Sequence, residues 1–190
     1  MKILHGIGLF FLLATAVNTA QAGDNPRLKA IFDADQAERE KDPINWNTLI
    51  PNDTKRRAEL HRMLEQNTVT TGLDYYEAAF IQQHGLKPDD YLLAHVLAMA
   101  ALTKGYIQAR WIAAATLDRY LQQNQHPQIF GTQTVIRTVA GTRKEEAPTR
   151  APFNTTLVPD SLRATLGVAD LKTLANRLSQ KDYHSSDGEN

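Results

Sequence analysis

The chain has 190 residues with 21 basic and 21 acidic side chains, so its formal net charge is zero at pH 7 when its six histidines are neutral. This balance gives no electrostatic attraction for nucleic acid or for an anionic membrane surface, and we expect neither as a partner. The chain has no cysteine, which excludes disulfides, thiolate metal ligands and cysteine nucleophiles. Its length suits one domain with a hydrophobic core.

The first 22 residues have the pattern of a secretory signal peptide. Lys2 gives a positive start, residues 3–17 are mostly apolar, and Ala20 and Ala22 form a small-x-small cleavage site. The apolar run is shorter than the roughly 20 residues that a membrane span needs, which disfavours an uncleaved anchor. We therefore expect cleavage near Ala22, a periplasmic or secreted protein, and no membrane span after cleavage.

The next hundred or so residues predict five helices. Apolar residues at helical spacing, with helix breakers between them, place these helices at residues 25–41, 54–65, 74–84, 90–103 and 106–123. Asn52 or Asp53 is expected to cap the second helix, and the fourth is apolar enough to be buried on most sides. Because short connections make neighbouring helices antiparallel, we expect up-and-down helical hairpins.

The pattern changes after Pro127. Thr, Val and Ile recur with partial alternation over residues 129–139, which predicts a strand, and residues 153–158 are the candidate for a returning strand. We expect a small β-hairpin or an irregular extended segment near 128–158. Two short helices then follow, one opened by Pro159 and Asp160 and closed by Gly167, the other at 169–180. The expected fold is mainly α, with a signal peptide at 1–22, one helical domain at 23–180 and a flexible tail at 181–190.

None of the common signatures of catalysis or cofactor binding is present in the sequence. The chain has no glycine-rich phosphate loop, no dinucleotide-binding fingerprint, no His-Glu-x-x-His and no Gly-x-Ser-x-Gly. The histidines lack the spacing of a standard metal site. We therefore expect no cofactor and no metal, although these absences do not exclude an enzyme.

The predicted topology brings polar residues together at one end of the helical domain, which we call the polar pole. Alternate helix ends meet there, and the segment after the fifth helix leaves from the same place. His95 on the fourth helix is expected about one turn from Asp118. The polar pole comprises Asp35, Arg39, Asp53, Arg56, Arg57, Gln83, His84, Asp89, Asp90, Tyr91, Asp118, Arg119, Tyr120, Gln128, Thr132 and Gln133.

Each of these residues also has an ordinary structural explanation. His95 fits a core histidine, Asp118 fits a carboxylate that pairs with an arginine or caps a helix, and the arginines fit a solvated rim. His84, just before Gly85, fits a residue favoured at a helix C-terminus by the helix dipole. The sequence leaves open whether the polar pole is a site or a set of packing contacts.

Three strings of residues carry a resemblance to a known family. "QHG" at 83–85, "LDRYL" at 117–121 and "PQIFGTQ" at 127–133 resemble a bacterial domain family of unknown function, often exported and helical. The resemblance covers about residues 33–167 and implies that these polar strings are characteristic of the family, without implying a catalytic role. Residues 100–121 resemble a tetratricopeptide-like hairpin more weakly, and a true repeat array is the less expected alternative.

Two functions follow from the polar pole. In the first, which we favour, an exported module binds an unknown ligand, peptide or partner protein, and arginines hold its carboxylate or phosphate. In the second, a hydrolase or transferase uses His84 as general acid/base and Asp118 as the orienting carboxylate. The expected ligand-binding residues are Asp35, Arg39, Arg56, Tyr91, His95, Arg119, Gln128, Thr132 and Gln133.

The shape of the polar pole distinguishes these functions. A deep pocket with His84 and Asp118 within hydrogen-bond reach favours an enzyme, whereas a broad open groove favours binding. A third possibility, a structural or inhibitory partner protein, predicts a large apolar surface patch instead. The sequence identifies neither the ligand nor the oligomeric state.

Overall fold

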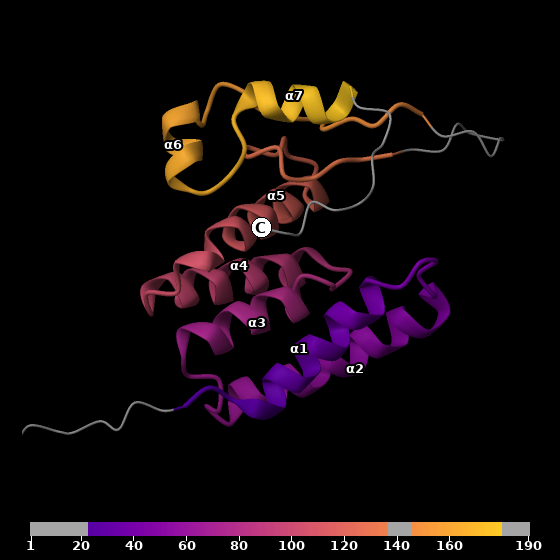
Figure 1. The fold of residues 1–190 in the computed structure, drawn as a ribbon, viewed down its shortest axis with the longest axis vertical. Coiled ribbons are helices and arrows are strands. Elements are labelled where there is room, and N and C mark those ends of the chain that lie inside the picture. The colour runs from indigo at the N-terminus through magenta and orange to yellow at the C-terminus, as the bar shows by residue number, and fades with distance from the viewer. Residues whose placement is uncertain (1–22, 137–145, 180–190) are drawn as a thin grey trace, which may run out of the picture.

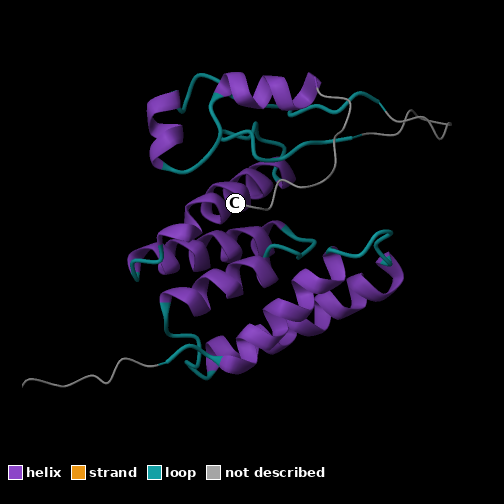
Figure 2. Cartoon of the chain, viewed as in Figure 1, coloured by secondary structure: helices purple, strands orange, loops and turns teal. Residues whose placement is uncertain are grey.

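The structure is a computed structural model, and it describes residues 23–136 and 146–179. Within these ranges the chain forms seven α-helices and no β-strand, which confirms the mainly α prediction (Figure 2). The expected signal peptide at 1–22, the tail at 181–190 and residues 137–139 of the expected strand lie outside the described residues. None of the described helices is long and apolar enough to cross a membrane.

The first five helices follow one another through the molecule in alternating directions (Figure 1). α1 (Pro26–Arg39) and α2 (Trp46–Glu65) lie side by side, and α3 (Gly72–Gln82) packs on both. α4 (Pro88–Thr103) then packs on α3. A 3-10 turn, η1 (Ile107–Ala109), leads into α5 (Arg110–Gln123), which packs on α4. The helices agree with the sequence prediction apart from displaced ends, and the largest displacement is at α2.

The start of α2 corrects the prediction. The helix begins at Trp46, where the Asn45 side chain accepts a hydrogen bond from the Asn47 N–H, and Pro51 lies inside it. A proline removes one backbone donor and usually ends or kinks a helix, so the sequence suggested a break before 54. Asp53 is consequently not a cap. It lies within α2 and binds arginines with its side chain.

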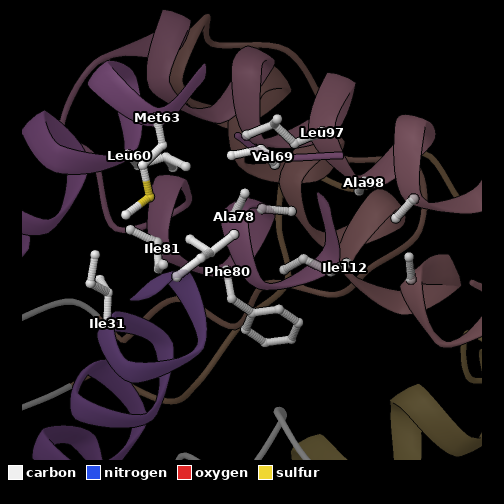
Figure 3. Packing of buried hydrophobic residues seen from close by; sticks show 14 of the residues in the cluster. Ile31, Leu60, Met63, Val69, Ala78, Phe80, Ile81, Leu97, Ala98 and Ile112 are labelled. Atoms are coloured by element: carbon white, nitrogen blue, oxygen red, sulfur yellow. The ribbon is translucent and has the colours of Figure 1, made fainter. Parts of the chain in front are cut away.

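The main hydrophobic core lies among α1 to α5 (Figure 3). Small side chains let α3, α4 and α5 approach closely, and at Gly72 an added Cβ would lie 2.8 Å from the Cβ of Tyr106. The buried residues of this core are Leu28, Ile31, Leu60, Met63, Val69, Ala78, Ala79, Phe80, Ile81, Leu97, Ala98, Ala101, Ala109, Ile112 and Ala113.

α4 is less enclosed than its composition suggested. α3 and α5 flank it and bury Ala94, Leu97 and Ala98, but Leu92, Val96 and Met99 are exposed. These three lie at i, i+4 and i+7, so they form one apolar stripe on the helix surface. The expectation that α4 is buried on most sides is therefore wrong for this stripe.

The C-terminal part adds a second, smaller core on the far side of α5. Ala114 of α5 packs with Phe130, Val158 and Val168, and α6 (Asp160–Thr165) and α7 (Leu171–Ser179) lie across this end of the molecule (Figure 1). The expected β-hairpin is not formed in the described residues. Two isolated bridges replace it, a parallel one at Gln128–Phe153 and an antiparallel one at Val135–Thr149. The extended segment is thus irregular, which was the alternative expectation.

One buried carboxyl group in α3 predicts a pH dependence of stability. Glu77 is only 2 % exposed. Burial raises its pKa to about 7, the charge of Lys29 opposes this rise, and the carboxylates of Asp33, Asp74 and Asp24 add to it. An unfolded glutamate titrates near 4.5. The folded protein therefore binds the extra proton between these values, and its stability falls as pH rises from about 4.5 to about 7.

Glu77→Gln should remove the fall in folding stability that the wild type shows as pH rises, because glutamine does not ionise. We expect the variant to match the wild type near pH 4.5 and to exceed its free energy of unfolding by about 3 kcal/mol at pH 8. Urea unfolding measured across this pH range checks it. Glu65→Gln, at an exposed position of α2, is the control and should keep the wild-type profile. Parallel profiles for Glu77→Gln and wild type would contradict the assignment.

Candidate functional site

The structure divides the polar pole into two separate networks. The first, which we call the Asp35 network, joins the end of α1, the middle of α2 and the turn after α3. Its members are Asp35, Glu38, Arg39, Asp53, Arg56 and His84.

Two arginines bridge the carboxylates of the Asp35 network. The Arg39 guanidinium lies 2.7 Å from Asp35 Oδ1 and 2.8 Å from Asp53 Oδ2. Arg56 lies 3.1 Å from Asp53 Oδ1 and 2.7 Å from Glu38 Oε2. Because each guanidinium serves carboxylates from both α1 and α2, these pairs fix the two helices together. Arg39 and Arg56 are therefore occupied by internal partners.

His84 faces Asp35, the most buried carboxylate of this network. Its Nε2 lies 3.4 Å from Asp35 Oδ2, but Nε2 makes no hydrogen bond among the described residues. Burial lowers the pKa of His84, and the charges of Arg39 and Arg119 add to this effect while Asp35 opposes it. Burial also opposes ionisation of Asp35, yet the contact with His84 and the charges of Arg39 and Arg56 lower its pKa. At neutral pH the pair is thus a neutral imidazole beside a carboxylate.

The turn between α3 and α4 holds His84 in place. Arg57 donates to the His84 carbonyl oxygen, and the Tyr91 hydroxyl donates to the Gly85 carbonyl oxygen at 2.8 Å. Asp90 accepts from the backbone N–H groups of residues 86 and 87. A Cβ on Gly85 would lie 2.1 Å from the Cβ of Asp90, so only glycine fits there. The "QHG" string therefore encodes a tight turn.

Arg119 on α5 completes this side of the pole. Its electrostatic neighbours are Tyr91, Arg39 and His84. Within the described part of the chain it has no hydrogen bond and no ion pair, and its Nε is buried without an acceptor. Burial lowers its pKa, since no carboxylate compensates for the lost hydration. Arg119 is thus a partly buried guanidinium that the described residues leave unsatisfied.

The second network surrounds the preceding residue, Asp118. Asp118 Oδ1 accepts from the N–H groups of Ile129 at 2.8 Å and Phe130 at 3.0 Å. Its Oδ2 accepts from the Thr132 N–H at 2.9 Å and the Thr132 hydroxyl at 2.8 Å. Asp118 is fully buried, so these four bonds satisfy its charge. The Asp118 network consists of Asp118, Gln128, Thr132, Gln133, Arg150 and Arg163.

Side chains also satisfy the carbonyl groups of this segment. Arg163, fully buried, donates to the carbonyl oxygens of Phe130 at 2.8 Å and Ile129 at 3.0 Å, and Arg150 donates to that of Gly131. The side-chain amide of Gln128 exchanges two hydrogen bonds with the backbone of residue 133. In the described residues these bonds take the place of pairing with a neighbouring strand, which accounts for the lack of a β-hairpin there.

Gly131 is needed within this segment for two reasons. Its φ is +70°, which favours glycine, and an added Cβ would lie 2.8 Å from both Leu174 Cδ1 and Phe153 Cζ. Arg150 and Arg163 were missed by the sequence analysis. The sequence of α6 gave no signal for Arg163, because its apolar neighbour Leu162 is exposed while Arg163 is buried.

The expected residues therefore separate by role. His84 faces Asp35, and the charges of Arg39 and Arg119 act on it. Arg56 instead binds carboxylates of the Asp35 network, and Tyr91 binds the Gly85 carbonyl oxygen. Asp118 and Gln128 form hydrogen bonds to the backbone of residues 129–133. The structure does not bring His84 and Asp118 together. The residues that take part in the Asp118 network instead are Gln128, Thr132 and Gln133.

His95 and a small cavity beside the Asp118 network fit a structural role. His95 Nδ1 lies 2.9 Å from the Ala113 carbonyl oxygen, which matches a satisfied core histidine. A cavity of about 20 Å³ beside the Asp118 network, lined by Trp111, Phe130 and Thr132 among others, has room for about one water. Neither His84 nor Asp118 lines it. In the described ranges no group of three or more His, Asp and Glu side chains is arranged to hold a metal ion.

The contrast between the two arginines predicts opposite effects of one substitution. Arg119→Met keeps the apolar stem and removes an unsatisfied charge, so we expect the free energy of unfolding to rise by about 1 kcal/mol. Arg163→Met strands several buried carbonyl groups, and we expect a loss of about 3 kcal/mol. Urea unfolding at pH 7 measures both. Similar losses in the two variants would show that Arg119 has a structural partner after all.

Comparisons of the chain with protein-family models, with curated proteins and with solved structures give no match.

Proposed function

We propose that the protein is an exported binding protein, periplasmic or secreted, that holds a negatively charged group of a ligand, peptide or partner protein at Arg119. The observation that carries the proposal is the absence, among the described residues, of any acceptor for this half-buried guanidinium. Arginine is rarely buried without a partner, because an unpaired charge costs several kcal/mol. A bound anion would supply the missing acceptor.

The other arginines of the polar pole support this choice. Arg39 and Arg56 bind Asp35, Asp53 and Glu38, and Arg57 donates to a backbone carbonyl. Their donors are therefore directed at internal acceptors, whereas those of Arg119 are not. The Asp35 network, in turn, fixes α1 and α2 and so keeps the surroundings of Arg119 rigid, as a binding site requires. In this proposal the alternating helices serve as a tetratricopeptide-like scaffold.

An enzyme, hydrolase or transferase, is the second candidate. Here His84 would act as general acid/base, and Asp35, 3.4 Å from its Nε2, would take the orienting role first expected of Asp118. The lowered pKa of His84 keeps the imidazole neutral and therefore able to accept a proton. Turnover of any compound that stabilises the protein, with a pH–rate profile altered by His84→Gln, would favour this candidate over simple binding.

Export is tested by the N-terminus of the protein recovered from its natural location. The small-x-small pattern at Ala20 and Ala22 predicts cleavage after Ala22. Mass spectrometry of the periplasmic and secreted fractions should therefore find a chain that begins at Gly23. Recovery of the uncleaved chain from the cytoplasm alone would contradict export and leave the binding proposal to be judged separately.

Binding is tested by a thermal-shift screen of small molecules and peptides. A ligand at ten times its Kd should raise the wild-type Tm by about 4 °C. Arg119→Met should abolish that shift, because the ligand loses its counter-charge. Arg62→Met is the matched control, at an exposed position of α2, and should keep the shift. Equal shifts in wild type and Arg119→Met would remove Arg119 from the site.

A further inference from the structure

We infer that the group bound at Arg119 is a single carboxylate, held by the fork of N–H groups on one guanidinium, and that the site prefers it to a phosphate. The inference rests on the proposed function and narrows it to one class of ligand. Two sources share this chemistry, a small carboxylic acid and the free C-terminus of a peptide.

The first argument is the number of available cations. Arg119 is accompanied by Arg39 and His84. Arg39 already binds Asp35 and Asp53, at 2.7 and 2.8 Å, so internal carboxylates compensate its charge. His84 is a neutral imidazole beside a carboxylate. One free positive charge therefore faces the ligand, which matches the single charge of a carboxylate and leaves the second charge of a phosphate without a partner.

The second argument is repulsion from the Asp35 network. Asp35 is fully buried and lies 3.4 Å from the His84 Nε2, so its negative charge sits directly behind the imidazole. The charge of Arg119 acts on the same imidazole, so an anion at Arg119 would lie near this buried carboxylate. A second negative charge there would be repelled by Asp35 at short range and in a poorly hydrated environment. A monoanion that places both oxygens on Arg119 avoids most of this repulsion.

The third argument is the geometry of the unsatisfied atom. Nε of Arg119 is the buried, unsatisfied nitrogen. Nε and the adjacent Nη point in parallel and are spaced to bind the two oxygens of one carboxylate side by side. A lysine at this position has no such fork. The site should therefore require arginine itself and not only a positive charge.

NMR titration of the arginine Nε–H resonances provides the test. The probes are N-acetylglycine, its neutral analogue N-acetylglycinamide, and inorganic phosphate, all at constant ionic strength. We expect N-acetylglycine to shift the Arg119 Nε–H signal saturably, N-acetylglycinamide to leave it unchanged, and phosphate to bind at least tenfold more weakly. Arg119→Lys should weaken N-acetylglycine binding at least tenfold, and Arg62→Met should leave it unchanged.

The two sources are separated with one peptide made with a free and with an amidated C-terminus. A free peptide that binds at least tenfold more tightly than N-acetylglycine, and loses this on amidation, identifies a peptide C-terminus. Equal affinities identify a small acid. Binding of phosphate as tight as that of N-acetylglycine, or no shift with N-acetylglycine at all, overturns the inference. If phosphate alone binds and Arg119→Met abolishes it, the proposed function stands while the carboxylate inference fails.

Discussion

The buried backbone of residues 129–132 sets the constraint on which the C-terminal half depends. These residues pack against α5, and the described part of the chain offers them no neighbouring strand. Their N–H and carbonyl groups therefore need other partners in an interior that excludes water. Asp118 accepts from the N–H groups and Arg163 donates to the carbonyl groups. One carboxylate and one guanidinium, 45 positions apart in the sequence, therefore fasten the second core onto the first.

The position of Asp118 also determines which way the next residue of α5, Arg119, points. Successive residues of an α-helix point about 100° apart around its axis. Since Asp118 faces the segment at 129–132, Arg119 faces a different side, where Arg39, Tyr91 and His84 are its neighbours. The two adjacent charges of α5 thus serve different networks. The Asp118 carboxylate accepts hydrogen bonds from the backbone of residues 129–132, whereas the Nε of Arg119 has no acceptor among the described residues.

The sequence predicted which residues reach one end of the helices but not which of them meet. Helix order and length fix the position of a residue along an axis, whereas its direction around that axis depends on packing that the sequence shows only weakly. His84 and Asp118 were therefore expected to meet, whereas the structure places His84 beside Asp35 and Asp118 beside residues 129–132. The β-hairpin failed for a related reason, because Thr and Val residues favour a strand locally while Arg163, 33 residues beyond Phe130, satisfies the backbone first.

Arg163 and Arg119 differ in the acceptors that the fold provides for their guanidinium groups. At Arg163 the chain supplies carbonyl oxygens from residues 129, 130, 158 and 169. Arg39 and Arg56 receive carboxylates. The fold can therefore satisfy such a group with either kind of acceptor, and neither is provided to Arg119 by the described residues. An uncompensated charge lowers stability, and proteins commonly retain such a cost where a binding partner removes it. Arg119 is accordingly the position where an acceptor from outside the described structure has the most to contribute.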